Sequence, residues 1–165
     1  MPNPQASEKF KKNIKRINED VNAYYQPAAK ATYACLVLHE HLGLVDNIVQ
    51  VSKYLLGPKI TLMIPDLFTT VTSKTLLNNE FDAIKKLKFS RVYDVVGICV
   101  EELKKNHKNI ILMGFSVGSA YGLKILEKMG DQSSFLCSFL YYGLPDLKNF
   151  EASKIKTKTV IFYGT

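Results

Sequence analysis

The sequence predicts an α/β fold with a mainly parallel central sheet that helices cover on both faces. Short apolar runs alternate with helical patterns from Tyr33 onward, which is typical of strand–helix–strand crossover units. The runs have the length and the β-branched or aromatic content of buried strands. They are YACLVL (33–38), ITLMI (60–64), IILM (110–113), FLCSFLYY (135–142) and TVIFY (159–163). In such sheets a ligand site lies outside the carboxyl ends of the strands.

The N-terminal residues predict an amphipathic helix within 1–18. Apolar residues recur at helical spacing after a polar start at Ser7, at positions 10, 14, 17 and 21, which places this helix over about 7–18. The stretch VNAYYQP, 21–27, is interpreted as a short edge strand that Pro27 ends.

Three further helical patterns lie between the strands. The first stops at Gly57-Pro58, the second occupies one helix face, and the third follows Ser116 and ends at Gly130. Their apolar residues are Leu44, Ile48, Val51 and Leu55; Val92, Val95, Val96, Cys99, Val100 and Leu103; and Val117, Ala120 and Ile125 to Met129. At 165 residues the chain is sized for one core, so we expect residues 1–165 to form a single domain.

The charge pattern argues against a nucleic-acid-binding protein. The net charge of +7 comes from 22 lysines and arginines against 15 acids, and only Arg16 and Arg91 are arginines. Nucleic-acid surfaces use arginine and gather basic residues with aromatic ones on one face. These lysines are scattered apart from KFKKNIKR near the start, so we interpret them as a solubilising coat and expect no nucleic-acid partner.

The cysteines and the hydropathy predict a cytoplasmic protein with no membrane partner. Cys35, Cys99 and Cys137 each stand in an apolar stretch, where a thiol behaves as a small hydrophobe. An odd count without close pairing favours a reducing compartment. The start has no apolar signal core, and no run approaches the length of a membrane span.

A serine stands between two glycines in MGFSVGSAYG, 113–122. The GFSVG pentapeptide matches Gly-x-Ser-x-Gly, the nucleophile elbow in which a sharp strand-to-helix turn exposes the serine hydroxyl. A tight turn with a helix-capping Ser116 is the other interpretation. The glycines at 114, 118 and 122 are spaced by four, which matches neither the dinucleotide fingerprint nor the phosphate loop, so no cofactor is expected.

The segment HEHLGL, 39–44, follows the first strand of the alternating series. His39 and His41 would face one side of a strand, but further ligands are missing, so we expect no metal. Glu40 at the end of a buried strand needs a partner. Because the carboxyl ends of parallel strands share one edge of the sheet, Glu40 is expected to point near Ser116.

Four separated segments resemble the dienelactone hydrolase family of the α/β-hydrolase fold. They are LVLHEHLGLVDNIVQVSKYLL, TLMIPDLF, ILMGFSVGSAYGLKIL and FLYYGLPDL, in register from about Ala23 to Thr165. The resemblance implies a three-layer α/β-hydrolase-like fold and a serine hydrolase that acts on a small ester, lactone or thioester. It also implies that the aspartate and histidine of the catalytic triad follow the TVIFYGT strand, so the sheet is expected to be truncated at its C-terminal edge and able to self-associate there.

The resemblance also assigns roles to individual residues. It implies that Ser116 is the nucleophile with Glu40 beside it. The backbone N–H groups of His41 and Val117 would form the oxyanion hole, where two donors stabilise developing negative charge. Tyr142 of the YYG segment would line the substrate pocket.

Two positions depart from the family pattern. Members that act on dienelactone have a cysteine nucleophile where this chain has Ser116, and an arginine soon after PDL where this chain has Thr69 and Thr70. Threonine cannot form a bidentate clamp for a carboxylate. A generic ester or thioester is therefore expected, rather than dienelactone.

The residues present offer few substitutes for the missing base. His39, His41 and Glu40 lie in the loop that faces the elbow, and a Ser–His or Ser–Glu pair would serve if one of them accepted the serine proton. Loop or strand-end residues with satisfied hydrogen bonds are the simpler interpretation of both histidines. His107 is expected to be exposed at a helix end, and Asp146 to belong to a Pro-Asp turn. The alternative function is a catalytically inactive binding or regulatory protein that kept the fold.

Overall fold

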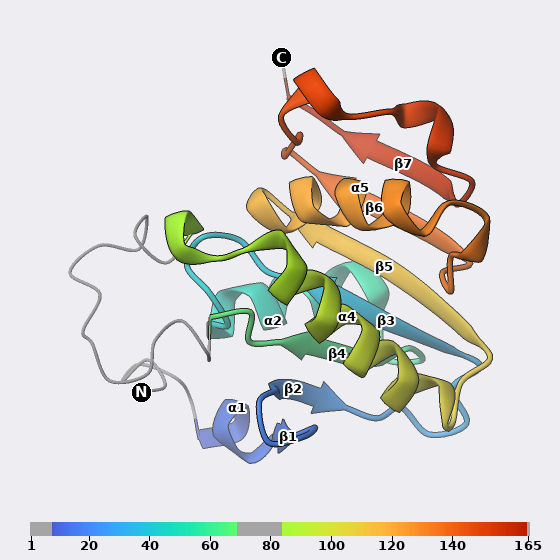
Figure 1. Cartoon of the computed structure of the whole chain (residues 1–165). Coiled ribbons are helices and arrows are strands. Elements are labelled where there is room, and N and C mark those ends of the chain that lie inside the picture. The colour runs from blue at the N-terminus through green and yellow to red at the C-terminus, as the bar shows by residue number, and fades with distance from the viewer. Residues whose placement is uncertain (1–7, 69–83, 165) are drawn as a thin grey trace.

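The computed structural model describes residues 8–68 and 84–164, which contain one seven-stranded sheet (Figure 1). The strand order is β1-β2-β4-β3-β5-β6-β7. The strands β4, β3, β5, β6 and β7 run parallel to one another. The strand β1 pairs antiparallel with β2, and β2 pairs antiparallel with β4. The strands are β1 Ile14–Arg16, β2 Asn22–Gln26, β3 Tyr33–Leu38, β4 Thr61–Pro65, β5 Asn109–Phe115, β6 Cys137–Tyr141 and β7 Lys158–Phe162. The mainly parallel sheet expected from the alternating pattern is confirmed.

Helices cover both faces of this sheet and divide the core into two layers. The helices α4 (Phe89–Lys104) and α5 (Val117–Met129) lie in front of the sheet in Figure 1, and α2 (Asp46–Leu56) lies behind it. Because side chains alternate along a strand, Leu36 of β3 packs in the layer under α4 and α5, while Val37 packs in the layer with Ile48 of α2. The short helices are α1 Glu8–Lys12 and the 3-10 turns η1 Gly130–Gln132, η2 Leu147–Asn149 and η3 Ala152–Lys154.

The N-terminal helix expected over 7–18 is wrong in extent. The helix α1 ends at Lys12, and β1 follows and pairs with β2, with Ile14 opposite Tyr24. A turn at Asn18, whose side chain accepts a hydrogen bond from the Asp20 N–H at 3.0 Å, returns the chain to β2. Local side-chain bonding of this kind competes with helix formation. The strand expected over 21–27 is present, but β1 covers it, so β2 is not an edge strand.

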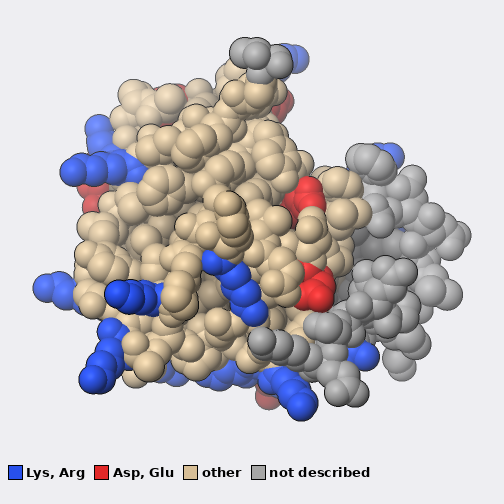
Figure 2. All heavy atoms as spheres, turned by 180° about the vertical axis from the view of Figure 1, so that it is seen from behind, with Lys and Arg blue, Asp and Glu red and all other residues tan. Residues whose placement is uncertain are grey.

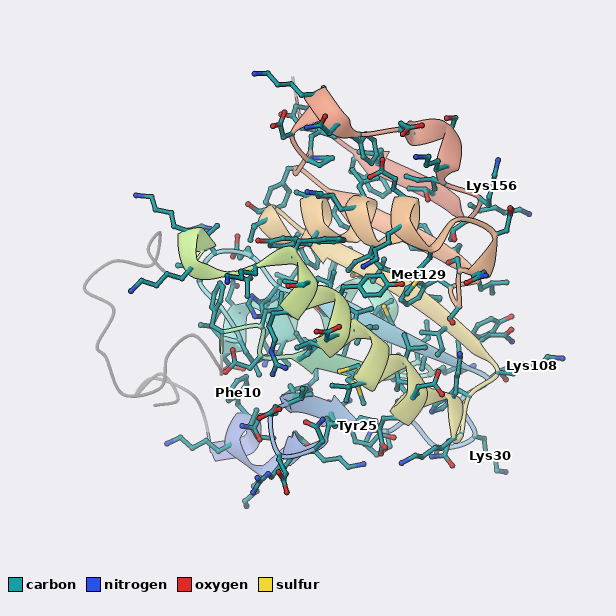
Figure 3. The ribbon with its side chains drawn as sticks, viewed as in Figure 1. Phe10, Tyr25, Lys30, Lys108, Met129 and Lys156 are labelled. Atoms are coloured by element: carbon teal, nitrogen blue, oxygen red, sulfur yellow. The ribbon has the colours of Figure 1, made fainter. Side chains whose placement is uncertain are left out.

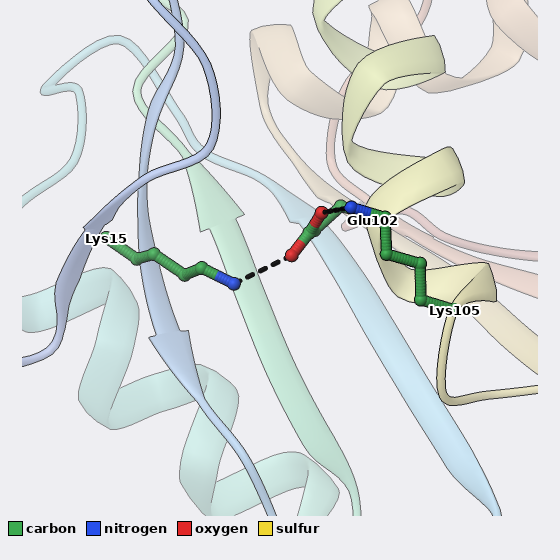
Figure 4. Close-up of polar contacts among 3 residues, drawn as sticks. All are labelled: Lys15, Glu102 and Lys105. Carbon is green, nitrogen blue, oxygen red and sulfur yellow. Dashed lines mark hydrogen bonds and ion pairs between the residues drawn. The ribbon is translucent and has the colours of Figure 1, made fainter.

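An ion-pair cluster links the β1 hairpin to the helix layer (Figure 4). Lys15 Nζ on β1 lies 2.7 Å from Glu102 Oε1 on α4, and Lys105 Nζ lies 2.6 Å from Glu102 Oε2. Hydrogen bonds from Lys105 and Lys15 hold the pKa of Glu102 below its usual range. Both lysines are largely exposed, so solvent screening keeps the contribution of these pairs to stability small.

The helix α2 occupies its expected place but turns a different face to the sheet. Ile48, Val49 and Ser52 are buried, while Val51 and Leu55 of the expected apolar series are exposed. The expected and the observed faces share Ile48 but differ by part of a turn, because Val49 and Ser52 are buried in place of Val51 and Leu55.

Basic side chains are dispersed over the surface. Figure 2 shows them spread around the back face of the molecule rather than gathered into one stripe. No helix within residues 8–68 and 84–164 is long and apolar enough to cross a bilayer. Cys35, Cys99 and Cys137 are free thiols, and burial raises the pKa of Cys99 to about 12. The absence of a nucleic-acid partner and the cytoplasmic location stay predictions.

The strand β7 presents apolar side chains to solvent. Among the described residues its only sheet neighbour is β6. Val160, Ile161 and Phe162 are between 45% and 47% exposed, although successive side chains point to opposite faces of a strand. Both faces of β7 are therefore open within the described part of the chain.

Candidate active site

The backbone of Ser116 adopts a conformation that few non-glycine residues occupy. The residue lies between β5 and α5 with φ 52° and ψ −120°. Its N–H donates to the Tyr141 carbonyl at 2.9 Å, and its carbonyl accepts from the Ala120 N–H at 3.1 Å. Such backbone strain costs about 1–3 kcal/mol and persists only when surrounding contacts enforce it. A capping role does not explain it, because the Ser116 side chain makes no cap hydrogen bond.

The two flanking glycines permit the close approach that enforces this turn. A Cβ on Gly114 would lie 2.8 Å from the Gly118 carbonyl oxygen. A Cβ on Gly118 would clash with the carbonyl oxygens of Leu38 and His39 at the end of β3. Backbone therefore packs on backbone here, as the GFSVG spacing predicts.

Two further segments meet the elbow at the carboxyl edge of the sheet. The register pairs Leu38 with Gly114 and Phe115 with Tyr141, so the loops after β3 and β6 flank the turn after β5. Gly143 lies directly against the Ser116 carbonyl, where a Cβ would clash. The Ser119 hydroxyl donates to the Gly143 carbonyl at 2.8 Å and fixes this loop to α5.

Glu40 and Tyr142 lie together across this edge. The Tyr142 hydroxyl donates to Glu40 Oε2 at 3.4 Å, and His41 Nδ1 lies 4.0 Å from the same oxygen. Partial burial and the Glu40 carboxylate raise the pKa of Tyr142. Tyr142 has φ 42°, and its N–H donates to the Phe162 carbonyl at 2.8 Å, so β7 holds it in this strained conformation.

His39 and His107 are both buried, but at opposite ends of the sheet. The His39 ring is fully buried and both ring nitrogens have hydrogen-bond partners, Glu40 and Leu67, so it is a satisfied loop histidine. His107 is only 8% exposed, which corrects the expectation of an exposed residue: it is buried in the turn after α4, where its N–H donates to the Leu103 carbonyl at 3.0 Å. Its neighbour Lys108 lies at the amino end of β5, and Ser116 follows the opposite end of the strand (Figure 3). Since β5 spans about 20 Å, His107 cannot reach Ser116.

Asp146 lies in a turn, and two residues not identified from the sequence support the elbow. Asp146 accepts from the Lys148 N–H at 3.1 Å, as the Pro-Asp turn predicts. Thr69 and Thr70 lie outside the described residues. Ser119 and Gly143 were missed as supports of Ser116, although a glycine directly after Tyr142 was a signal for close backbone approach. Within residues 8–68 and 84–164, no three His, Cys, Asp or Glu side chains are grouped as metal ligands are.

Comparison with solved structures identifies the fold of the chain. No protein-family model matches the chain, and no curated protein matches its sequence. A provisionally named dienelactone hydrolase from Klebsiella pneumoniae superposes with a TM-score of 0.64 over 86% of this chain, at 13% identity. The chain has the α/β-hydrolase fold. The predicted fold class is thus confirmed, and so is the resemblance to dienelactone hydrolases at the level of fold.

Two other solved structures agree with this assignment. A dienelactone hydrolase-like promiscuous phosphotriesterase, P91, from metagenomic libraries has a TM-score of 0.63, 13% identity and 87% of this chain covered. A phospholipase/carboxylesterase from Dyadobacter fermentans has a TM-score of 0.60, 15% identity and 84% covered. This chain spans 65%, 62% and 66% of the length of the three proteins, in the order given.

A methyl group at Gly118 is expected to destabilise the protein. Gly118→Ala would force α5 away from the end of β3, at a cost of about 1–3 kcal/mol in the free energy of unfolding measured by urea denaturation. The control is Gly97→Ala in α4, where a Cβ meets nothing within 4 Å and is expected to stabilise by about 0.5–1 kcal/mol. Equal effects of the two substitutions would contradict the close approach at the elbow.

Removing the strain at Ser116 is expected to stabilise the fold. Ser116→Gly relieves a conformation that costs about 1–3 kcal/mol, whereas Ser116→Ala keeps the Cβ and the strain. The free energy of unfolding of the glycine variant should therefore exceed that of the alanine variant. The opposite order in urea denaturation would mean that Ser116 carries no strain in solution.

Proposed function

We propose that this chain carries the nucleophile of a serine hydrolase that acts on a small ester, lactone or thioester. The backbone of Ser116 is the observation that supports this most strongly. A strained serine at the strand-to-helix turn, flanked by glycines in backbone contact, serves no capping role and holds its hydroxyl at the edge where α/β sheets bind ligands.

The proposed reaction follows from the groups around Ser116. Its Oγ attacks the substrate carbonyl carbon while a base takes the hydroxyl proton, and the carbonyl π electrons move onto oxygen. The oxyanion then collapses, the alcohol or thiol leaves with a proton, and water hydrolyses the acyl-enzyme by the same steps. The N–H of Val117, at the positive end of α5, and the N–H of His41, in the opposite loop, are the proposed oxyanion donors.

Glu40 and Tyr142 are proposed to shape the substrate side of this site. The carboxylate of Glu40 would orient the Ser116 hydroxyl, and Tyr142, tied to Glu40 and half exposed, would contact the substrate. A ring hydroxyl that keeps its proton over a wide pH range is a donor suited to a neutral ester. Thr69 and Thr70 stand where dienelactone hydrolases have an arginine for the substrate carboxylate, which favours a neutral ester or thioester over dienelactone.

The triad aspartate and histidine are proposed to come from residues after Thr165. Two of the three histidines are unsuited to the role, because His39 is fully hydrogen bonded in the interior and His107 lies at the opposite end of β5 from Ser116. His41, whose Nδ1 lies 4.0 Å from Glu40 Oε2, is the alternative base within the chain. A reading frame that continues into an aspartate and then a histidine would agree with the proposal.

Covalent labelling tests the nucleophile. A fluorophosphonate probe should label the protein expressed from its complete reading frame, with the modified peptide containing Ser116, and Ser116→Ala should abolish labelling. Ser153→Ala is the control, because Ser153 is an exposed serine in η3 and its loss should leave labelling unchanged. Equal labelling of the Ser116→Ala variant would exclude Ser116 as nucleophile, and no labelling of the natural protein would favour the inactive binding protein.

Self-association through β7 is a second proposal, supported by the apolar side chains on both of its faces. Val160→Lys combined with Ile161→Lys should reduce association of the 165-residue chain, because opposed lysines on paired strands repel. Sedimentation velocity over a range of concentrations measures this. Tyr54→Lys on α2, at a side chain that is 88% exposed, is the control. A chain that stays monomeric at all concentrations would contradict the proposal.

A further inference from the structure

His39 joins two loops through its side chain. Its Nδ1 lies 2.8 Å from the Glu40 carbonyl oxygen in the loop after β3, and its Nε2 lies 3.0 Å from the Leu67 backbone nitrogen in the loop after β4. A backbone N–H can only donate, so Nε2 accepts and carries no proton. Nδ1 therefore carries the single proton and donates it to Glu40. The two contacts together define one neutral tautomer.

The surroundings of the ring keep it in this state. The His39 side chain is 0% exposed, and its ring packs edge-on against Phe68 with 4.9 Å between ring centroids. Burial lowers the pKa of His39, and the carboxylates of Asp66, from the loop after β4, and of Glu40, from its own loop, oppose this shift. A second ring proton would point an N–H at the Leu67 N–H and break that hydrogen bond.

The backbone around His39 also contacts the elbow. The carbonyl oxygens of Leu38 and His39 lie where a Cβ on Gly118 would stand, directly beside the first turn of α5. His39 thus touches Ser116's helix with its backbone and the loop after β4 with its ring. The residue that follows Glu40, His41, is the proposed oxyanion donor, so the position of its N–H depends on how this loop is held.

We propose that His39 is a positioning residue whose neutral imidazole ties the Glu40–His41 segment to Leu67 and so fixes one half of the oxyanion hole. This inference rests on the proposed function for its catalytic consequence, but the tie itself does not. The tie consists of the hydrogen bond from the Leu67 N–H to His39 Nε2, and protonation of Nε2 would break this bond.

Two substitutions distinguish the effect of this hydrogen bond from the effect of filling the buried space with a side chain. The amide oxygen of His39→Gln can reach the place of Nε2 and accept from Leu67, whereas the shorter His39→Asn can replace only Nδ1. Neither side chain titrates. Hydrolysis of p-nitrophenyl acetate by the protein from its complete reading frame should stay within about threefold of the natural rate for the glutamine variant, while kcat falls about 100-fold for the asparagine variant with little change in KM.

Two measurements test the tie without hydrolase activity. Long-range proton–nitrogen NMR correlations of the His39 ring should show a protonated Nδ1 and an unprotonated Nε2 at neutral pH. Hydrogen exchange of the Leu67 amide, corrected for its intrinsic rate, should keep its protection through the ordinary histidine range and lose it only on further acidification, because burial lowers the pKa of His39. The glutamine variant should keep that protection, and the asparagine variant should lack it at every pH.

The outcomes distinguish the two proposals. If the fluorophosphonate probe fails to label Ser116 but Leu67 protection follows this pattern, the hydrolase proposal fails and the tie stands. If labelling succeeds but the glutamine and asparagine variants have equal kcat, His39 does not position the oxyanion hole. A protonated Nε2 at neutral pH, or equal Leu67 protection in both variants, would overturn the tie itself.

Discussion

The contact on which the candidate site depends is the one between the first turn of α5 and the carboxyl end of β3. Gly118 lies against the carbonyl oxygens of Leu38 and His39, closer than any side chain would permit. This approach brings the loop after β3 to the turn after β5 and leaves Ser116 in its strained backbone conformation. Gly114 and Gly143 provide space on the other two sides, so the serine is held by backbone atoms from three strands.

Much of the fold was predictable because its signals are local. The buried strands β3 to β6 are apolar runs bounded by polar loops, and the helix α4 places its six buried side chains on one face at helical spacing. The GFSVG pentapeptide was also sufficient to predict the elbow, because the spacing of its glycines is typical of this strand-to-helix turn. The steric purpose of Gly114 is local, against the Gly118 carbonyl, whereas that of Gly118, against Leu38 and His39 at the end of β3, is visible only in the structure.

The parts that sequence reasoning missed depend on distant partners. The helix expected over 7–18 gives way to β1 because β2 offers a strand to pair with, and the Asn18 turn permits the return. His107 was expected in solvent, but it is buried in the turn after α4. The role of His39 was equally hidden, because its decisive contact, Leu67, is 28 residues away in the chain. Apolar periodicity carries no information about such pairings.

The backbone hydrogen bonds at the carboxyl edge form a continuous relay across three strands. The Tyr142 N–H binds the Phe162 carbonyl of β7, and the Ser116 N–H binds the carbonyl of Tyr141, the adjacent residue. The two residues that donate these hydrogen bonds, Tyr142 and Ser116, both have positive φ. The peptide group between Tyr141 and Tyr142 is thus hydrogen bonded to the outer strand on one side and to the Ser116 N–H on the other, so the placement of β7 bears on the geometry of the elbow.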